Sequence, residues 1–147
     1  MAQHVGERAI GYLLVASGSQ RKREESLRIQ RQAILRYARI HDAEIVAMYF
    51  DYDSAGDTEM RSGLLTAMQR LRGGHASLLI VESLRRLSRV DLEWLAGMIP
   101  ESPSAVCWGL ISVVERLDSR TSDGLSRLKF GNRKQSTEYV RLGERHV

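Results

Sequence analysis

Residues 9–15 read AIGYLLV, a short and unbroken apolar run near the start of the chain. A run of this length predicts a strand that is covered on both faces, as strands of parallel sheets are. The run SLLIV at residues 77–81 predicts a second buried strand. Residues 44–50 and 105–114 also have strand composition, so the chain supplies four strands for one sheet.

Three segments between these strands carry apolar residues at helical spacing, and they cover residues 24–40, 63–72 and 91–99. In the first of them Leu27, Ile34 and Tyr37 form the apolar stripe. The alternation of strands and helices predicts an α/β domain with a mostly parallel sheet and crossover helices.

The chain has 147 residues, which is the length of one domain. We expect this domain to cover residues 1–124. Residues 125–147 are polar and basic, and they are interpreted as a C-terminal tail or an eroded oligomerisation helix.

The composition, 43% hydrophobic and 27% charged, is typical of a globular protein. A single cysteine, Cys107, excludes a disulfide scaffold and a multi-cysteine zinc site. The four histidines have no ligand spacing, so we expect no metal and no cofactor. The start of the chain lacks a signal-peptide pattern, and no apolar run approaches the ~20 residues of a membrane span. The sequence therefore predicts a cytoplasmic protein without membrane contact.

The net charge of +4 is unevenly distributed along the chain. Residues 20–40 carry seven basic and two acidic side chains, a net +5, and residues 120–147 carry seven and three, a net +4. The remainder therefore has a net charge of −5. Two arginine-rich segments in an otherwise acidic chain indicate an anionic partner, because the guanidinium group can bind two phosphate oxygens at once. Solvated helix faces would give the same pattern, so charge alone leaves both interpretations open.

Ligand sites of parallel α/β sheets lie beyond the carboxyl ends of the strands. Three predicted strands end in polar segments, which are residues 16–20, 51–61 and 82–89. We expect residues 51–61 to form a loop. In the third segment a helix would place Arg85, Arg86 and Arg89 on one face, with the neighbouring leucines packed inward.

The motifs at these three ends resemble those of serine recombinases of the resolvase and invertase family. GYLLV at residues 11–15, followed by Gln20 and the SLRIQ of residues 26–30, resembles a Tyr-x-Arg-Val-Ser-Thr strand that leads into a Ser-Leu-x-x-Gln helix. The SAG and RSGL of residues 54–64 resemble a Ser-Gly loop followed by Arg-x-Gly-Leu. LRRLSR at residues 84–89 resembles Leu-Asp-Arg-Leu-Ser-Arg. Order and spacing agree from about residue 9 to residue 123, so the resemblance implies a resolvase-type fold and a role in DNA recombination.

The same resemblance implies a changed reaction site. The family's nucleophilic serine falls on Ala16, and a phosphate-binding arginine falls on Leu14. Ala55 stands where the family has the serine of its Ser-Gly loop, and Arg85 where it has an aspartate.

Four positions of this sequence match residues that the family uses around the scissile phosphate, and they are Gln20, Arg61, Arg86 and Arg89. The resemblance thus implies a partly retained phosphate cradle whose attacking group is lost.

Three functions follow as alternatives. A degenerate recombinase domain would contact the DNA backbone with low sequence specificity, or would associate with a second copy or an intact recombinase. An active enzyme would instead use Ser17 or Ser19, although such serines are more often turn hydroxyls. A protein-interaction module would have kept the fold and would no longer bind DNA. Because the segment after residue 124 is short and polar, we expect no sequence-specific DNA reading by this chain alone.

Overall fold

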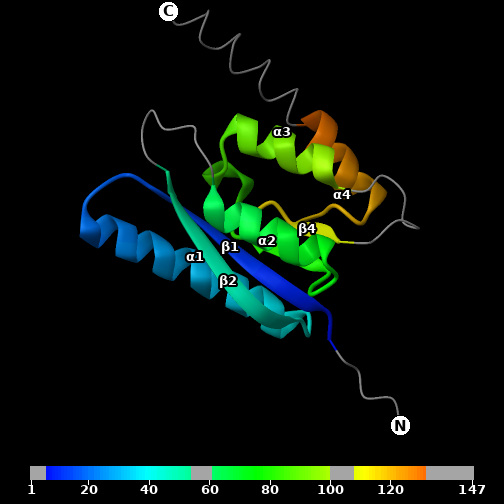
Figure 1. The fold of residues 1–147 in the computed structure, drawn as a ribbon, viewed down its shortest axis with the longest axis horizontal. Helices are drawn as coiled ribbons and strands as arrows, with labels where there is room; N and C mark the ends of the chain where they lie inside the picture. Colours follow the sequence, from blue (N-terminus) through cyan, green and yellow to red (C-terminus); the bar gives the residue numbers. More distant parts are fainter. Residues whose placement is uncertain (1–5, 54–60, 100–107, 132–147) are drawn as a thin grey trace, which may run out of the picture.

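The computed structural model describes residues 6–53, 61–99 and 108–131, which form a five-stranded sheet with helices on both faces (Figure 1). The strands are β1 (Arg8–Ala16), β2 (Glu44–Asp53), β3 (Leu78–Val81), β4 (Gly109–Ser112) and β5 (Leu117–Asp118). Their spatial order is β2-β1-β3-β4-β5. The first four strands are parallel, and β5 is antiparallel to β4. The predicted α/β class with a mostly parallel sheet is confirmed.

Helices and turns fill the connections between the strands. They are α1 (Gln20–Ile40), α2 (Ser62–Arg72), the 3₁₀ turn η1 (Leu84–Arg86), α3 (Arg89–Met98), α4 (Ser122–Ser126) and the π turn η2 (Arg127–Gly131). Helix α1 covers one face of the sheet, and α2 and α3 cover the other (Figure 1).

Strand β1 supplies side chains to both hydrophobic cores, because successive residues of a strand point to opposite faces. Ile10, Tyr12 and Leu14 pack with α2 and α3, whereas Ala9 and Leu13 pack with α1. Strand β3 lies between β1 and β4, and all four of its residues are buried. These positions confirm the two strands that were predicted to be covered on both faces.

Helix α1 and strand β2 are longer than predicted. Helix α1 begins at Gln20 rather than at residue 24, because the Ser19 hydroxyl caps it by accepting a hydrogen bond from the Lys22 N–H at 3.2 Å. Strand β2 continues through residues 51–53, where a loop was expected, because β1 pairs with it as far as Ala16 and Asp53. The rest of that predicted loop, residues 54–60 with Ala55, lies outside the described residues.

The expectation that Arg85, Arg86 and Arg89 share one helix is also wrong. The turn η1 ends at Arg86, and Leu87 has extended backbone angles with its side chain buried. Ser88 then caps α3 through a reciprocal pair of hydrogen bonds with Asp91. Burial of Leu87 and capping by Ser88 thus divide the segment between Arg86 and Arg89.

Two elements that the sequence did not predict, β5 and η2, complete the sheet and one of its hydrophobic cores. Leu117 of β5 is buried, and Leu128 of η2 lies in the same core as α2 and α3. The strand predicted at residues 105–114 is β4, and residues 105–107 lie outside the described residues. Within the described ranges, no helix is long and apolar enough to cross a membrane.

Candidate phosphate-binding site

The end of β1 is held by a glutamine side chain from α1. Strand β3 pairs with β1 only as far as Tyr12, so β1 extends beyond this neighbour. The Leu14 N–H donates to Oε1 of Gln30 at 3.1 Å, and Nε2 of Gln30 donates to the Leu14 carbonyl at 3.0 Å. Gln30 is 1% exposed. Its amide gives Leu14 the pair of hydrogen bonds that a strand would give, and it fixes the backbone two residues before Ala16.

Ala16 is the last residue of β1 and is exposed to solvent. Leu14 is buried in the core below α2 and α3. Ser17 follows on the exposed turn, where Ser19 caps α1. Nε2 of Gln20 donates to Glu24 at 3.2 Å on the surface. The end of β1 therefore presents a methyl group flanked by exposed polar side chains.

Arg86 connects the segment after β3 to the end of β1. Its Nε donates to Glu82, which directly follows β3, at 2.9 Å. Its Nη1 donates to the Ser26 hydroxyl at 3.1 Å. That hydroxyl also accepts from Nε2 of Gln30 at 3.0 Å. A chain of hydrogen bonds thus links the Arg86 guanidinium to the backbone of Leu14.

Arg61 lies at the start of α2 and pairs with a residue of α3. Its Nη2 is 3.2 Å from Oδ2 of Asp91, and both side chains are mostly buried. The same carboxylate accepts hydrogen bonds from the N–H and the hydroxyl of Ser88. Arg61 is therefore tied to the short connection that separates Arg86 from Arg89.

Asp51 of β2 fixes the N-terminus of α2 beside Arg61. Its carboxylate accepts hydrogen bonds from the N–H groups of Gly63 and Leu64 at 2.8 and 3.0 Å. The buried Tyr12 hydroxyl donates to the same carboxylate at 2.6 Å. Burial and this hydrogen bond raise the pKa of Tyr12 far above its usual value, so the phenol stays protonated.

Arg89 is the most exposed of the three arginines that are predicted to form the phosphate cradle, Arg61, Arg86 and Arg89. It donates to Glu93, one turn further along α3, at 3.1 Å, and its side chain is 67% exposed. The structure thus anchors Arg61 and Arg86 between elements, whereas the ion pair of Arg89 stays within α3.

Glu115 supports the arginine segment and was not singled out by the sequence. Its carboxylate accepts hydrogen bonds from the Ser83 hydroxyl at 2.7 Å, the Leu84 N–H at 3.0 Å and the Ser112 hydroxyl. Partial burial raises the pKa of Glu115, but these hydrogen bonds outweigh burial and bring it below its usual value. Glu115 therefore binds the start of η1 as a carboxylate.

A family model for the N-terminal domain of resolvases matches residues 9–130. The chain belongs to the resolvase N-terminal domain family. The match covers the sheet apart from Arg8, and it includes every residue of the site just described, so the resemblance noted in the sequence is confirmed at the level of the family.

Solved structures show the same fold as this resolvase domain. The N-terminal catalytic domain of TP901-1 integrase has a TM-score of 0.67 at 17% identity, with 91% of this chain and 98% of that chain covered. A resolvase family site-specific recombinase from Streptococcus pneumoniae has a TM-score of 0.66 at 23% identity, covering 95% and 94%. The C-terminal catalytic domain of ISC1926 TnpA, an IS607-like serine recombinase, has a TM-score of 0.57 at 24% identity, covering 72% and 69%. No curated protein matches the chain.

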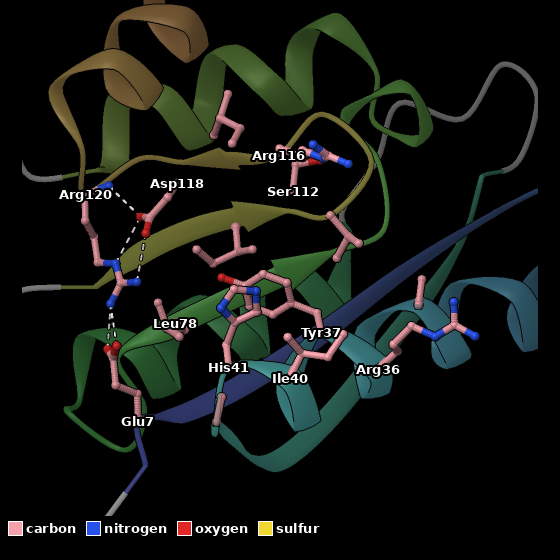
Figure 2. Close-up of a pocket in the computed structure, with 15 residues that line it drawn as sticks. Glu7, Arg36, Tyr37, Ile40, His41, Leu78, Ser112, Arg116, Asp118 and Arg120 are labelled. Atoms are coloured by element: carbon pink, nitrogen blue, oxygen red, sulfur yellow. Dashed lines mark hydrogen bonds and ion pairs between the residues drawn. The ribbon is translucent and has the colours of Figure 1, made fainter.

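One cavity of the resolvase domain lies away from the arginine segment. It has a volume of about 790 Å³ and opens between α1 and the β4–β5 hairpin (Figure 2). At one end Arg120 bridges Glu7 and Asp118 at 2.6 and 2.8 Å. Burial raises the pKa of Asp118, but its bonds with Arg120 outweigh burial and lower it. Neither Ala16 nor any arginine of the predicted cradle lines this cavity, so it is separate from the candidate site.

Proposed function

We propose that this resolvase domain binds the phosphate backbone of DNA and does not cleave it. The observation that carries the proposal is Ala16, which stands exposed at the end of β1. Attack on a phosphodiester needs an oxygen from which a proton can be removed, and the family's serine nucleophile falls on this position. A methyl group cannot perform that step. Leu14 also lacks the positive charge of the family's arginine, which would stabilise the pentacoordinate phosphate.

Arg86 supports retained phosphate binding. In the described part of the chain its contacts engage Nε and Nη1, so Nη2 can still donate to a phosphate oxygen. Glu82 and Ser26 restrict the rotamers of the side chain, which lowers the entropy lost on binding. Arg61, before α2, and Arg89, at the start of α3, would add positive charge near Arg86. Gln20 would add an exposed amide close to Ala16.

An active enzyme that uses a neighbouring serine is the first alternative. The Ser19 hydroxyl caps α1, so an attack by this oxygen would leave the Lys22 N–H without its cap. Ser17 is exposed and lies one residue beyond the end of β1. We propose that both are turn hydroxyls, and Ser17 is the one that the experiment must test.

Covalent trapping tests the proposal directly. The protein is incubated with supercoiled plasmid and with labelled duplexes, the reaction is stopped with detergent, and protein-linked or nicked DNA is sought on a gel. We expect neither product. A covalent adduct that disappears in Ser17→Ala or Ser19→Ala would overturn the proposal and establish the relocated nucleophile.

Backbone binding is tested by the salt dependence of affinity for unrelated duplexes. We expect dissociation constants of ~10⁻⁴ to 10⁻⁶ M at physiological salt. A footprint of roughly four phosphates gives a slope near −3.6 in a plot of log K against log salt. The variant Arg86→Ala/Arg89→Ala should flatten the slope by up to about two, whereas Arg72→Ala, an exposed arginine at the end of α2, should leave it unchanged. A slope near zero, or one unchanged in the double variant, would favour a protein-interaction module whose partner is a second copy or an intact recombinase.

A further inference from the structure

Two exposed aromatic rings lie on β2, the edge strand of the sheet. Phe50 and Tyr52 are 51% and 49% exposed. Their ring centroids are 5.5 Å apart and the rings are nearly perpendicular, so they form one aromatic cluster. The guanidinium carbon of Arg23, on α1, lies 5.4 Å from the centre of the Tyr52 ring. This is the distance of a cation–π contact.

A shallow groove continues this cluster along α1. It has a volume of about 400 Å³, and Phe50, Arg28 and Arg31 are among its lining residues. Leu27 and Met48 add apolar area to it. We call the set Arg23, Arg28, Arg31, Phe50 and Tyr52 the α1–β2 surface. Figure 1 shows α1 running beside the β1–β2 edge of the sheet.

The arginines of this surface are available to an anionic ligand. In the described ranges, Arg28 and Arg31 have no carboxylate partner, and both are exposed. Helix α1 as a whole carries seven basic side chains against Glu24 and Glu25. The surface therefore combines a positive field with exposed rings.

The surface begins beside the candidate site. Tyr52 pairs with Val15 in the register of β1 and β2, and Val15 directly precedes Ala16, so the surface reaches the end of β1 on the face that α1 covers. A strand of nucleic acid whose phosphate reaches the end of β1 could therefore continue across Tyr52 and Phe50 toward Arg28 and Arg31.

We infer that the α1–β2 surface binds single-stranded nucleic acid. Proteins that bind single strands combine a positive groove for the phosphates with aromatic rings on which bases stack. The bases of a duplex are stacked on one another, so a duplex would contact the arginines but could not stack on Phe50 and Tyr52. A second copy of the chain, docked through this patch by two-fold symmetry, would place the three arginines of each copy in the same interface, where their charges repel. The single strand is the partner that uses both features of the surface. This inference goes beyond the proposed function, because it concerns another surface and another form of nucleic acid.

The test measures anisotropy of a fluorescent oligothymidylate of about 12 nucleotides, a length within the range of known single-strand sites. Replacing both rings by leucine, Phe50→Leu/Tyr52→Leu, retains apolar area and removes stacking. We expect this variant to bind at least about tenfold more weakly, since each stacked base contributes about 1 to 3 kcal/mol. Tyr52→Phe keeps a ring and should bind as the wild type does. Trp94→Leu removes an exposed ring from α3 and is the matched control.

The charge of the surface is tested with Arg28→Gln/Arg31→Gln. For single strands each phosphate contact contributes about −0.7 to the salt slope, so this variant should flatten the slope by up to about 1.4. Circular dichroism melts of all variants show whether the fold is retained. The duplex measurements with Arg86→Ala/Arg89→Ala report on the cradle separately, so either idea can fail while the other stands.

Two results would overturn the inference. One is equal affinity of the wild type and of Phe50→Leu/Tyr52→Leu for the oligonucleotide, including no binding by either. The other is a dimer in sedimentation velocity that the double leucine variant dissociates, which would make the surface an interface between copies. Weaker binding by the leucine variant at an unchanged monomeric mass supports the inference.

Discussion

The two strand ends that form the candidate site differ in what they carry and in how they are held. The end of β1 offers an exposed methyl group at Ala16, above a backbone that Gln30 fixes from α1. The segment that follows β3 is dense in charged side chains, and Arg86 is held there by Glu82 and Ser26. The end of β1 keeps its support and lacks a nucleophile, whereas the segment after β3 keeps both its support and its charged side chains.

Under the proposed function, this difference explains how a reaction can be lost while its scaffold remains. The side chain of Ala16 is exposed at the end of its strand, so the identity of this residue has little effect on folding stability. The contacts of Arg61 with Asp91 and of Arg86 with Ser26 connect separate elements, and their loss would leave charged groups without partners. A domain that stops cleaving DNA is therefore free to change the end of β1 and is constrained to keep the arginine segment.

The largest expected effect comes from removing the support of β1. Gln30→Leu leaves the N–H and the carbonyl of Leu14 without their buried hydrogen-bond partners. We expect the free energy of unfolding to fall by roughly 2 to 4 kcal/mol, measured by urea denaturation. Gln32→Leu, an exposed glutamine of the same helix, is the control and should change stability by less than about 0.5 kcal/mol. Equal stability of the two variants would show that the end of β1 does not depend on this amide.

A second prediction concerns the arginine that joins α2 to α3. Arg61→Ala removes an ion pair whose side chains are 15% and 11% exposed. Asp91 keeps its hydrogen bonds from Ser88, which limits the damage. We expect a loss of about 1 to 3 kcal/mol in urea denaturation. If Arg61→Ala lost less stability than Arg89→Ala, the Arg61–Asp91 pair would not be the one that stabilises the fold.

The sequence predicted the strands of this site better than the contacts between them. Apolar runs such as residues 9–15 and 77–81 identify buried strands because burial on both faces requires continuous hydrophobicity. The start of α1 was missed because Ser19, an ordinary turn residue, serves as its cap. The burial of Leu87 was predicted, but its extended backbone was missed, because a helical spacing does not show where a helix is interrupted.

The partners of the arginines depend on tertiary structure. Glu82 and Arg86 lie four residues apart in the sequence, so their ion pair is a local contact. Asp91 lies 30 residues from Arg61, and Glu115 lies 31 residues from Leu84, so no local spacing connects them. A polar residue in the hairpin after a buried strand was the one available signal for Glu115, and it is too common to identify a role.

A third prediction tests how Glu115 holds the arginine segment. Its folded pKa lies below its ordinary value of 4.5, so the carboxylate stabilises the fold above that pH. This contribution is lost as the pH falls through the folded pKa, where Glu115 becomes protonated. Glu115→Gln should therefore lower stability by roughly 1 to 2 kcal/mol near neutral pH, and the difference from the wild type should close below about pH 4.5. Denaturation midpoints measured across this range check it, and a difference that is independent of pH would exclude a role for the charge.

The smallest expected effect belongs to Arg89, and it separates binding from stability. Its ion pair with Glu93 is 67% and 57% exposed, so solvent screens the attraction and both side chains lose entropy in forming it. We expect Arg89→Ala to change the free energy of unfolding by less than about 0.5 kcal/mol, in contrast to Arg61→Ala. The same variant should weaken duplex binding and reduce the salt slope by about 0.9, because an exposed guanidinium contributes one phosphate contact. Arg72→Ala is the matched control for both measurements. A stable variant with unchanged duplex affinity would remove Arg89 from the phosphate site and confine backbone binding to Arg61 and Arg86.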